Sequence, residues 1–350
     1  MIIRILRGTY HEMKYYRRTI IYTKVPLKGA FQYRDKFIFQ PITSKVAPRC
    51  AYARHYPAFL DYCLEAEDGL QEYDLIQKDI DYSRKICTVF TALSNFEFFT
   101  YHSTATVWGS AAPFERFEEL PQSDVEAYNE AARTSKWTAA VGYTYPEYAQ
   151  DRMINKLSVL EGNVGIALDE NPFYFTDNPI QEDKEEVSLQ EKTTDALDVF
   201  FSLGQKERDV VYSAMVLLTD GISLGLQHQS IGFVSFISSI ETMIDFENRD
   251  VRVEHCKECG QPVYSVSKKF IAYLSKYVSK TESSIGKFKR LYTLRSKIAH
   301  TGKLFLSDRE FSLLNKDTTN QEWYSYMEAQ QLARLSLFRW LLLNKSKVTK

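Results

Sequence analysis

Cysteine is scarce in this chain. Its 350 residues contain five cysteines, at Cys50, Cys63, Cys87, Cys256 and Cys259. An odd and sparse set fits a reducing compartment better than a disulfide framework. No apolar run reaches the roughly 18 residues that cross a bilayer, and the N-terminus lacks the apolar stretch and cleavage site of a signal peptide. We therefore expect a cytoplasmic protein that does not enter a membrane.

Sequence signatures of several enzyme classes are also missing. The chain has no phosphate-binding glycine loop and no Ser, His and Asp arrangement typical of hydrolases. His11, His55 and His102 lie in unrelated contexts without the spacing of metal ligands. The N-terminal half therefore offers no candidate site.

Charge is present in quantity but is unevenly distributed. Residues 205–350 hold 22 Lys and Arg against 15 Asp and Glu, whereas residues 1–204 hold 22 against 30. Residues 257–303 alone hold 11 Lys and Arg against two Glu. Such a basic segment is the electrostatic footprint expected for a nucleic-acid partner, although a solvated basic helix face gives the same pattern.

The N-terminal half is expected to mix strands and helices. Runs rich in β-branched and aromatic residues predict strands, at residues 17–23, 36–40 and 86–91. Residues 56–84 and 122–160 are more helical in character, and the acidic run 181–186 predicts a surface loop or linker. We therefore place a mixed α+β domain, with a sensing or gating role, at residues 1–195.

From residue 205 onward, helical periodicity replaces the strand pattern. Apolar side chains recur at helical spacing in five stretches, which begin at Val211, Phe233, Phe270, Ile285 and Leu332. Each apolar stripe needs a partner helix, so five helices with short connections predict a compact bundle over residues 205–350. The predicted fold class is α+β, with an all-α bundle following the mixed domain.

The residues best suited to chemistry lie at the end of the fourth helical stretch. Arg295 and His300 are five positions apart there, within the basic segment. Histidine moves protons near neutral pH, and arginine holds phosphate oxygens with a permanently charged planar fork. Such a pair can cut RNA without a metal. Arg295 also shares the apolar stripe of Phe288 and Leu291, so its guanidinium must be paired, face a cleft or face a second chain.

The spacing of Arg295 and His300 poses a geometric problem. Five residues separate the two side chains by about 140° on a straight helix. Gly302 offers one solution, because glycine favours the left-handed conformation that ends helices, and His300 would then lie at or beyond the last turn. A two-fold dimer with facing motifs is another solution. Structural roles fit as well, namely a salt bridge for Arg295 and a favourable helix-dipole interaction for His300.

Residues from about Gln205 to Lys345 resemble the HEPN superfamily, and most closely its ApeA-like group. The likeness rests on the Arg295 and His300 motif and on the order of the helices, with a Cys-containing connection between the second and third. HEPN ribonucleases form a composite site from two chains. The resemblance therefore implies a homodimeric endoribonuclease that acts on RNA, in prokaryotic defence against phages. A catalytically inactive HEPN module that binds RNA or protein remains the alternative.

The resemblance also implies roles for individual residues. Arg295 would stabilise the transition state and His300 would act in general acid–base catalysis, without a cofactor. Ser296 stands where many HEPN enzymes have Asn, Asp or His, and Glu241 would pair with Arg295, line the site or lie at its rim. The candidates to hold the RNA backbone, each equally explained by solubility, are Lys289, Arg290, Lys297 and Lys303.

Cys256 and Cys259 form a Cys-x2-Cys-Gly turn that resembles half of a zinc knuckle. A closed structural zinc site needs four ligands, and the chain has no second Cys-x2-Cys pair. His255, a distant cysteine or a second chain could complete the set. Two reduced cysteines in a turn are the simpler alternative.

The last helical stretch gives a further reason to expect a homodimer. Leu337, Leu341 and Leu343 lie outside its main apolar stripe and predict apolar surface that a second chain could cover. A helical oligomerisation domain that serves an N-terminal activity is a third interpretation of the chain.

Overall fold

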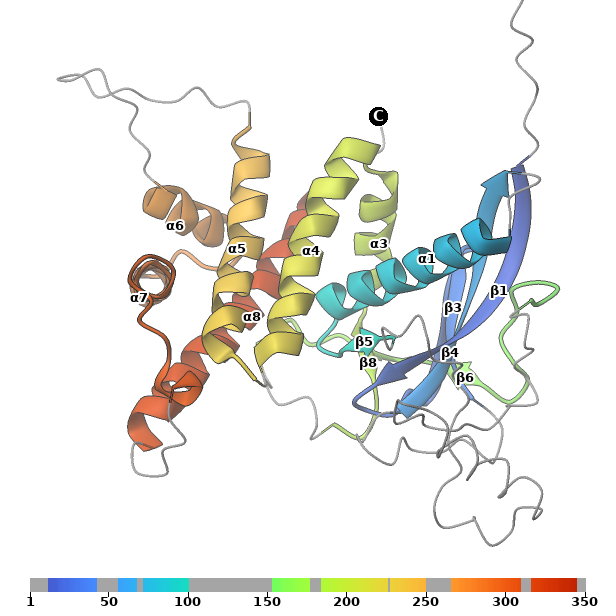
Figure 1. Ribbon diagram of the computed structural model, residues 1–350, viewed down its shortest axis with the longest axis horizontal. Helices are drawn as coiled ribbons and strands as arrows, with labels where there is room; N and C mark the ends of the chain where they lie inside the picture. Colours follow the sequence, from blue (N-terminus) through green and yellow to red (C-terminus); the bar gives the residue numbers. More distant parts are fainter. Residues whose placement is uncertain are drawn as a thin grey trace, which may run out of the picture. The chain divides into compact units, whose positions relative to one another are not determined.

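The computed structural model describes residues 12–42, 56–67, 72–100, 153–176, 184–225, 227–249, 266–309 and 316–344. A sheet-containing N-terminal region precedes a mostly helical C-terminal region (Figure 1). The predicted α+β class is therefore confirmed.

The chain divides into two compact units. The first comprises Met1–Cys87, Phe96–Leu168 and Ile180–Leu189, and the second comprises Thr88–Asn95, Asp169–Pro179 and Gln190–Lys350. The second unit thus includes two short segments from the earlier part of the chain in addition to the helical half.

A six-stranded sheet forms the framework of the first unit. Its strands are β1 (Glu12–Thr23), β2 (Gly29–Tyr33), β3 (Phe37–Pro41), β4 (Tyr56–Glu67), β5 (Phe98–Phe99) and β6 (Val164–Gly165). Their order across the sheet is β5-β1-β4-β3-β2-β6. The long strands β1 and β4 pair antiparallel throughout, from Glu12 opposite Glu67 to Thr23 opposite Tyr56. A separate two-stranded sheet joins β7 (Ala167–Asp169) to β8 (Ser188–Gln190).

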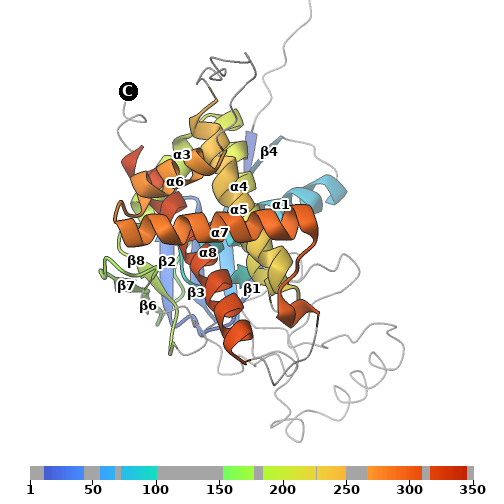
Figure 2. The same cartoon turned by 90° about the vertical axis from the view of Figure 1, so that its left-hand side faces the viewer.

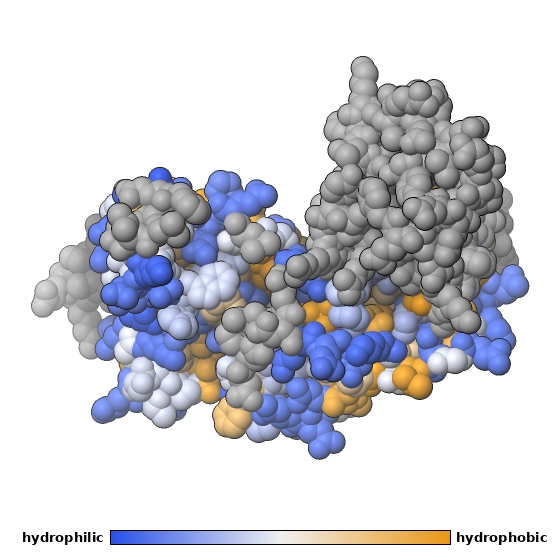
Figure 3. Space-filling view, turned by 90° about the horizontal axis from the view of Figure 1, so that it is seen from below, coloured by the Kyte–Doolittle hydropathy of each residue, from blue (hydrophilic) through white to orange (hydrophobic). Residues whose placement is uncertain are grey.

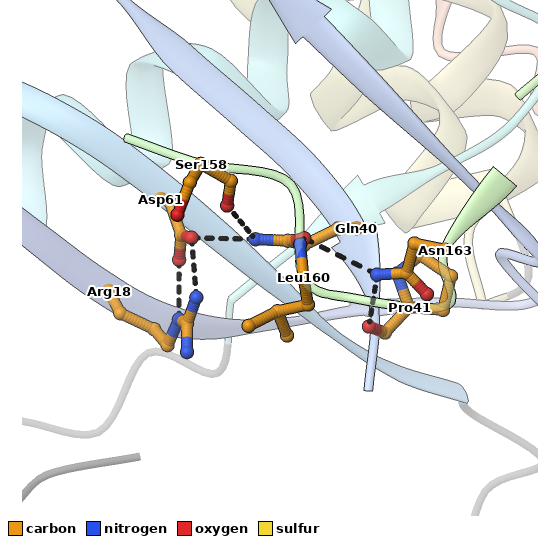
Figure 4. Close-up of polar contacts among 7 residues, drawn as sticks. All are labelled: Arg18, Gln40, Pro41, Asp61, Ser158, Leu160 and Asn163. Carbon is orange, nitrogen blue, oxygen red and sulfur yellow. Dashed lines mark hydrogen bonds and ion pairs between the residues drawn. The ribbon is translucent and has the colours of Figure 1, made fainter. Parts of the chain in front are cut away.

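Two adjacent arginines on β1 hold other parts of the first unit against the sheet. Arg17 and Arg18 point to opposite faces, because successive side chains of a strand alternate. Arg17 forms a buried ion pair with Asp79 of helix α1 (Glu72–Leu93). Arg18 pairs with Asp61 of β4, and Gln40 of β3 donates to the same aspartate (Figure 4).

Gln40 extends this network to the segment before β6. Its side-chain amide donates to the Ser158 carbonyl, and its carbonyl oxygen accepts from the Leu160 backbone N–H and from Asn163 (Figure 4). A buried amide is costly unless its donors and acceptors are satisfied. The network therefore fixes residues 158–163 across the sheet face opposite α1.

Two of the N-terminal predictions were wrong in the described residues. Of residues 56–84, which were expected to be helical, residues 56–67 form β4, whereas residues 72–84 lie in α1 as predicted. Residues 86–91, expected to be a strand, also belong to α1. Residues 58–62 of β4 are all buried, so the strand lacks the alternation that identifies a half-exposed strand. Residues 86–93 of α1 are buried with the single exception of Thr88. The helix is therefore covered on all sides at this end, and tertiary packing overrides local β propensity.

The prediction of helix over residues 122–160 can be compared with the structure only at residues 153–160. Residues 153–160 contain no helix, and residues 122–152 lie outside the described part of the chain. Of the predicted acidic loop, residues 184–186 are described and are neither helix nor strand.

The second unit contains the five expected helices and one more. The helices are α3 (Thr193–Ser202), α4 (Gln205–Gly225), α5 (Gln229–Glu247), α6 (Val266–Tyr277), α7 (Glu282–Thr301) and α8 (Lys316–Leu343), with a short 3-10 helix η3 (Leu306–Asp308). Helix α5 is central, since it packs against α4, α6, α7 and α8. Figure 2 shows α7 lying across this group of helices.

The predicted apolar stripes are the buried faces of these helices. Val211, Ala214 and Leu218 of α4 are fully buried, as are the four expected residues of α5, which are Phe233, Ile237, Ile240 and Ile244. On the face shown in Figure 3, the helical unit presents mainly hydrophilic residues with small apolar patches among them.

The expectation that Leu337 and Leu341 of α8 leave apolar surface to be covered was wrong. Leu337 and Leu341 are 1% and 0% exposed within the single chain. Helix α8 contacts α3, α4, α5 and α6, so it is covered on more than one side. Leu343, which is 64% exposed, is the remaining residue of the three.

Helices α4 and α5 approach closely through glycines. Gly221 and Gly225 of α4 face Gly232 of α5, and Tyr326 of α8 fills the remaining space, with its hydroxyl donating to the Gly221 carbonyl at 3.0 Å. A Cβ atom on Gly225 would lie 1.8 Å from the Tyr326 hydroxyl oxygen. The crossing therefore depends on the absence of a side chain there.

We expect Gly225→Ala to lower the free energy of unfolding by about 1–3 kcal/mol, because a methyl group must displace a buried tyrosine. Gly286→Ala is a matched control in α7, where an added Cβ meets nothing within 4 Å. The control should raise stability by up to about 1 kcal/mol, the helix-propensity difference between the two residues. Urea unfolding of both variants measures the contrast, and equal stabilities would contradict the packing account.

Candidate functional site

Helix α7 carries the two candidate catalytic residues and has defined ends. Thr281 caps its start, since the threonine hydroxyl accepts the Ser284 backbone N–H at 3.2 Å. Gly302 ends it in the left-handed conformation, at φ 65°, and donates its N–H to the Ile298 carbonyl at 3.1 Å. The prediction that Gly302 terminates this helix is confirmed.

The position of this cap leaves His300 within the helix. Because α7 continues to Thr301, the chain turns only after His300, and the histidine is exposed on the last turn. Arg295 instead lies on the side of α7 that faces α5, where it is about four-fifths buried. The expected helix end therefore does not bring the two side chains to one face of a single chain.

Arg295 is held by Glu241 of α5. An Nη2 atom of Arg295 donates to Oε2 of Glu241 at 2.9 Å, and the two side chains are 21% and 18% exposed. The Tyr292 hydroxyl, one turn before Arg295 on α7, also interacts with the Glu241 carboxylate and lowers its pKa. Of the three expected roles for Glu241, the pairing with Arg295 is the one observed.

Burial dominates the electrostatics of Glu241. Loss of solvent raises the pKa of Glu241 above its ordinary value, and Asp245 on the same helix acts in the same direction. The charge and hydrogen bond of Arg295, and the interaction with the Tyr292 hydroxyl, lower the pKa but do not offset the burial. Glu241 is therefore a carboxylate that accepts a proton more readily than an exposed glutamate.

Contacts at the start of α5 fix the helix that carries Glu241. The Asp308 carboxylate accepts the backbone N–H groups of Gln229 and Ser230 at 2.8 and 2.7 Å. The Ser230 hydroxyl in turn accepts the N–H of Phe305 at 2.7 Å. An acidic group at a helix N-terminus satisfies free N–H groups and favours the helix dipole, so the chain after α7 stabilises the start of α5.

The other candidate residues on and after α7 have varied environments. Ser296 is half-buried, and Lys289, Lys297 and Lys303 are exposed. Arg290 forms an ion pair with Glu328 of α8 at 2.5 Å. Lysines that point into solvent are available to a polyanion, whereas Arg290 has to exchange a partner first.

The candidate zinc ligands Cys256 and Cys259 lie outside the described residues. Within the described ranges, no group of three or more His, Cys, Asp or Glu side chains is arranged to hold a metal ion. None of the helices in the part of the chain that the structure describes combines the length and apolar character needed to span a lipid bilayer.

Comparisons of the chain with protein-family models, with curated proteins and with solved structures gave no match. The resemblance to HEPN ribonucleases therefore rests on the motif and the order of helices in this chain.

Tyr292 is a site residue that sequence reasoning missed. Its position placed it in the apolar stripe of α7, and its ring does pack against Phe270 of α6, with centroids 5.1 Å apart. A tyrosine in a half-buried stripe usually finds a partner for its hydroxyl. Because Tyr292 lies one turn before Arg295, this tendency could have indicated that its hydroxyl interacts with the same site.

Removal of Arg295 should have a pH-dependent effect on stability. Arg295→Ala leaves the Glu241 carboxylate buried without its cation, which raises its pKa further in the folded state. Because a raised carboxyl pKa destabilises the fold when the group is ionised, the loss of stability should be larger at neutral pH than at acidic pH. Thermal unfolding of Arg295→Ala at both pH values measures this difference.

The double variant Arg295→Ala with Glu241→Gln provides the control for this prediction. Glutamine carries no charge at either pH, so the double variant should be more stable than Arg295→Ala at neutral pH. A pH-independent loss in Arg295→Ala would show that the ion pair does not govern stability there.

Proposed function

We propose that this protein is a metal-independent endoribonuclease of the HEPN type, with Arg295 and His300 as its catalytic residues. The observation that carries the proposal is the environment of α7. Helix α7 presents an arginine that retains part of its surface, an exposed histidine and the exposed cations Lys289 and Lys297, and the exposed Lys303 follows directly after its end. These are the groups that RNA cleavage by the ribose hydroxyl requires.

The proposed reaction is an internal transesterification. The ribose 2′-oxygen attacks the adjacent phosphorus and loses its proton to a base, while the bond from phosphorus to the 5′-oxygen breaks. His300 protonates the leaving 5′-oxygen as general acid. Arg295 stabilises the additional negative charge on the phosphate oxygens in the transition state. The products carry 2′,3′-cyclic phosphate and 5′-hydroxyl ends.

The placement of the two residues favours a site made from two chains. Arg295 faces α5 whereas His300 is exposed on the last turn of α7, and the offset of about 140° between them persists because the helix is regular up to Thr301. A homodimer in which Arg295 of one chain approaches His300 of the other resolves this divergence, and two-fold symmetry forms two such sites.

Cleavage of single-stranded RNA in EDTA is the direct test of the activity. Arg295→Ala and His300→Ala should each reduce the rate by about 100-fold or more, as loss of a transition-state contact or a general acid does. His228→Ala and Arg309→Ala are matched controls, since both residues are exposed in the same unit and outside α7, and they should cleave at the wild-type rate. Product ends are identified by mass spectrometry.

Two results would reject the catalytic assignment. One is unchanged cleavage in both α7 variants, and the other is cleavage that disappears on repeated purification from the wild-type protein. RNA binding without cleavage would favour the alternative function, an inactive HEPN module that binds RNA.

Mixing the two inactive variants tests the two-chain site. In a mixed dimer of Arg295→Ala and His300→Ala chains, one site lacks both residues and the other retains both, so activity should return. Light scattering should report twice the 40.7 kDa chain mass. A monomeric protein that cleaves RNA, or mixed chains without restored activity, would place both residues in a single-chain site.

The defence role is a further part of the proposal and rests on the resemblance alone. A host that expresses the wild-type chain should resist phage infection, and hosts that express Arg295→Ala or His300→Ala should not. Equal plating on all three strains would separate the activity from defence.

A further inference from the structure

Arg17, Arg18 and Arg295 each pair with a carboxylate, but they do so in two different ways. Arg18 grips Asp61 with both Nε and Nη2, each at 2.6 Å (Figure 4). Arg17 likewise donates from Nε and Nη2 to the two carboxylate oxygens of Asp79, at 3.1 and 3.2 Å. Arg295 contacts Glu241 through Nη2 alone. A two-point fork is the stronger and more specific arrangement, so Arg295 is the arginine of the three whose pairing is incomplete.

The unused donor of Arg295 is buried. Its Nε atom is shielded from solvent and has no hydrogen-bond partner among the described residues. A buried donor without an acceptor is unfavourable, because it has lost its hydrogen bond to water and gained none in the protein. A second oxygen that accepts a hydrogen bond from Nε would therefore stabilise Arg295. Arg17 and Arg18 already donate from Nε to their aspartates.

We propose that Glu241 is a latch on Arg295, which holds the guanidinium in the empty site and must release it or become neutral before Arg295 can bind a phosphate group. This inference rests on the proposed function, in which Arg295 binds the phosphate of RNA. A phosphate offers several oxygens and can meet two donors of the guanidinium together, whereas Glu241 meets one. The carboxylate and the phosphate compete because both are anions that require the same cation.

Proton uptake by Glu241 is the route that lets both anions occupy the site. The charged and titratable groups that act on Glu241 are Arg295 and Tyr292 from α7 and Asp245 from α5 itself. Lys276 of α6 is paired with Glu247, further along α5. A phosphate at Arg295 adds negative charge beside a carboxylate whose pKa burial already raises, so Glu241 takes up a proton as phosphate binds.

Tyr292 has a distinct part in this arrangement. Its hydroxyl interacts with the Glu241 carboxylate, so a polar group remains beside the glutamate after Arg295 turns to the phosphate. Glu241 therefore stays in place and can recapture Arg295 when the site empties, which makes the release reversible.

The latch is tested by the binding of an RNA that cannot be cleaved. A fluorescein-labelled single-stranded oligonucleotide with 2′-O-methyl riboses lacks the attacking hydroxyl, and fluorescence anisotropy measures its affinity. Glu241→Gln should tighten binding by about tenfold, since it keeps the shape of the side chain and removes the competing charge; tenfold corresponds to about 1.4 kcal/mol. Circular dichroism first establishes that each variant is folded.

Glu328→Gln is the matched control. Glu328 also pairs with cations of α7, at 2.7 Å from Lys287 and 2.5 Å from Arg290, so its removal changes the total charge equally but leaves Arg295 held. In an Arg295→Ala background, Glu241→Gln should no longer tighten binding, whereas any effect of Glu328→Gln should persist. Tightening by Glu241→Gln that is no greater than the control, or that survives in Arg295→Ala, would overturn the latch.

A second measurement does not depend on the stability of the glutamine variant. In a His300→Ala background, binding should strengthen as the pH falls toward the raised pKa of Glu241, because protonation of Glu241 frees Arg295. The same pH series with Glu241→Gln should be flat, and equal pH dependence in both proteins would reject the latch.

The outcomes separate this inference from the ribonuclease proposal. Tighter binding in Glu241→Gln without cleavage by any variant keeps the latch and rejects the enzyme. Cleavage by the wild type without a change of affinity in Glu241→Gln keeps the enzyme and rejects the latch. Failure of Glu241→Gln to bind the oligonucleotide at all rejects the latch as well.

Discussion

A guanidinium group that leaves water must find acceptors for its hydrogen bonds, and this constraint organises much of the molecule. Arg17 and Arg18 are 6% exposed, and each is matched by an aspartate that is itself buried. Because the two arginines are neighbours on one strand, they act on opposite faces of the sheet. Arg17 fixes α1 through Asp79, and Arg18 fixes Gln40 and the segment around Ser158 through Asp61. Breaking either pair by removing one partner would leave a buried charge.

Arg295 is subject to the same constraint but meets it only in part. It donates one hydrogen bond to Glu241, and its buried Nε has no partner among the described residues. Arg295 therefore lacks the two-point contact that Arg17 and Arg18 make. The incomplete pairing distinguishes Arg295 from the two arginines of β1. It is the geometric basis of the proposed exchange of partners at α7.

The sequence predicted the helical half more fully than the sheet, for a physical reason. Helices α4 and α5 each bury one face, so Val211, Leu218, Phe233 and Ile240 recur at a spacing that periodicity detects. Strand β4 is buried on both faces and shows no such period. The partners of Arg17 and Arg18 were not predictable, because Asp79 and Asp61 become neighbours only through strand register and helix packing.

The candidate site was predictable to a similar, partial extent. The stripe position of Arg295 correctly indicated that it turns inward, and Gly302 correctly indicated the end of α7. The identity of its partner remained one of several alternatives, since it depends on how α5 and α7 cross. Tyr292 was counted as apolar because its ring is, although its hydroxyl reaches Glu241.

The fastening of Asp308 to the start of α5 has a mechanical consequence. Helices α5 and α7 are joined at two separate places, through Glu241 and Arg295 and through the short connection from Gly302 to Asp308. Two attachments restrict rotation of α7 about its own axis. If the Glu241–Arg295 pair is released, the connection from Gly302 to Asp308 still holds α7 to the start of α5. His300 lies two residues before Gly302, close to that second attachment. In the proposed mechanism, the residue that donates the proton is therefore anchored independently of the group that binds the anion.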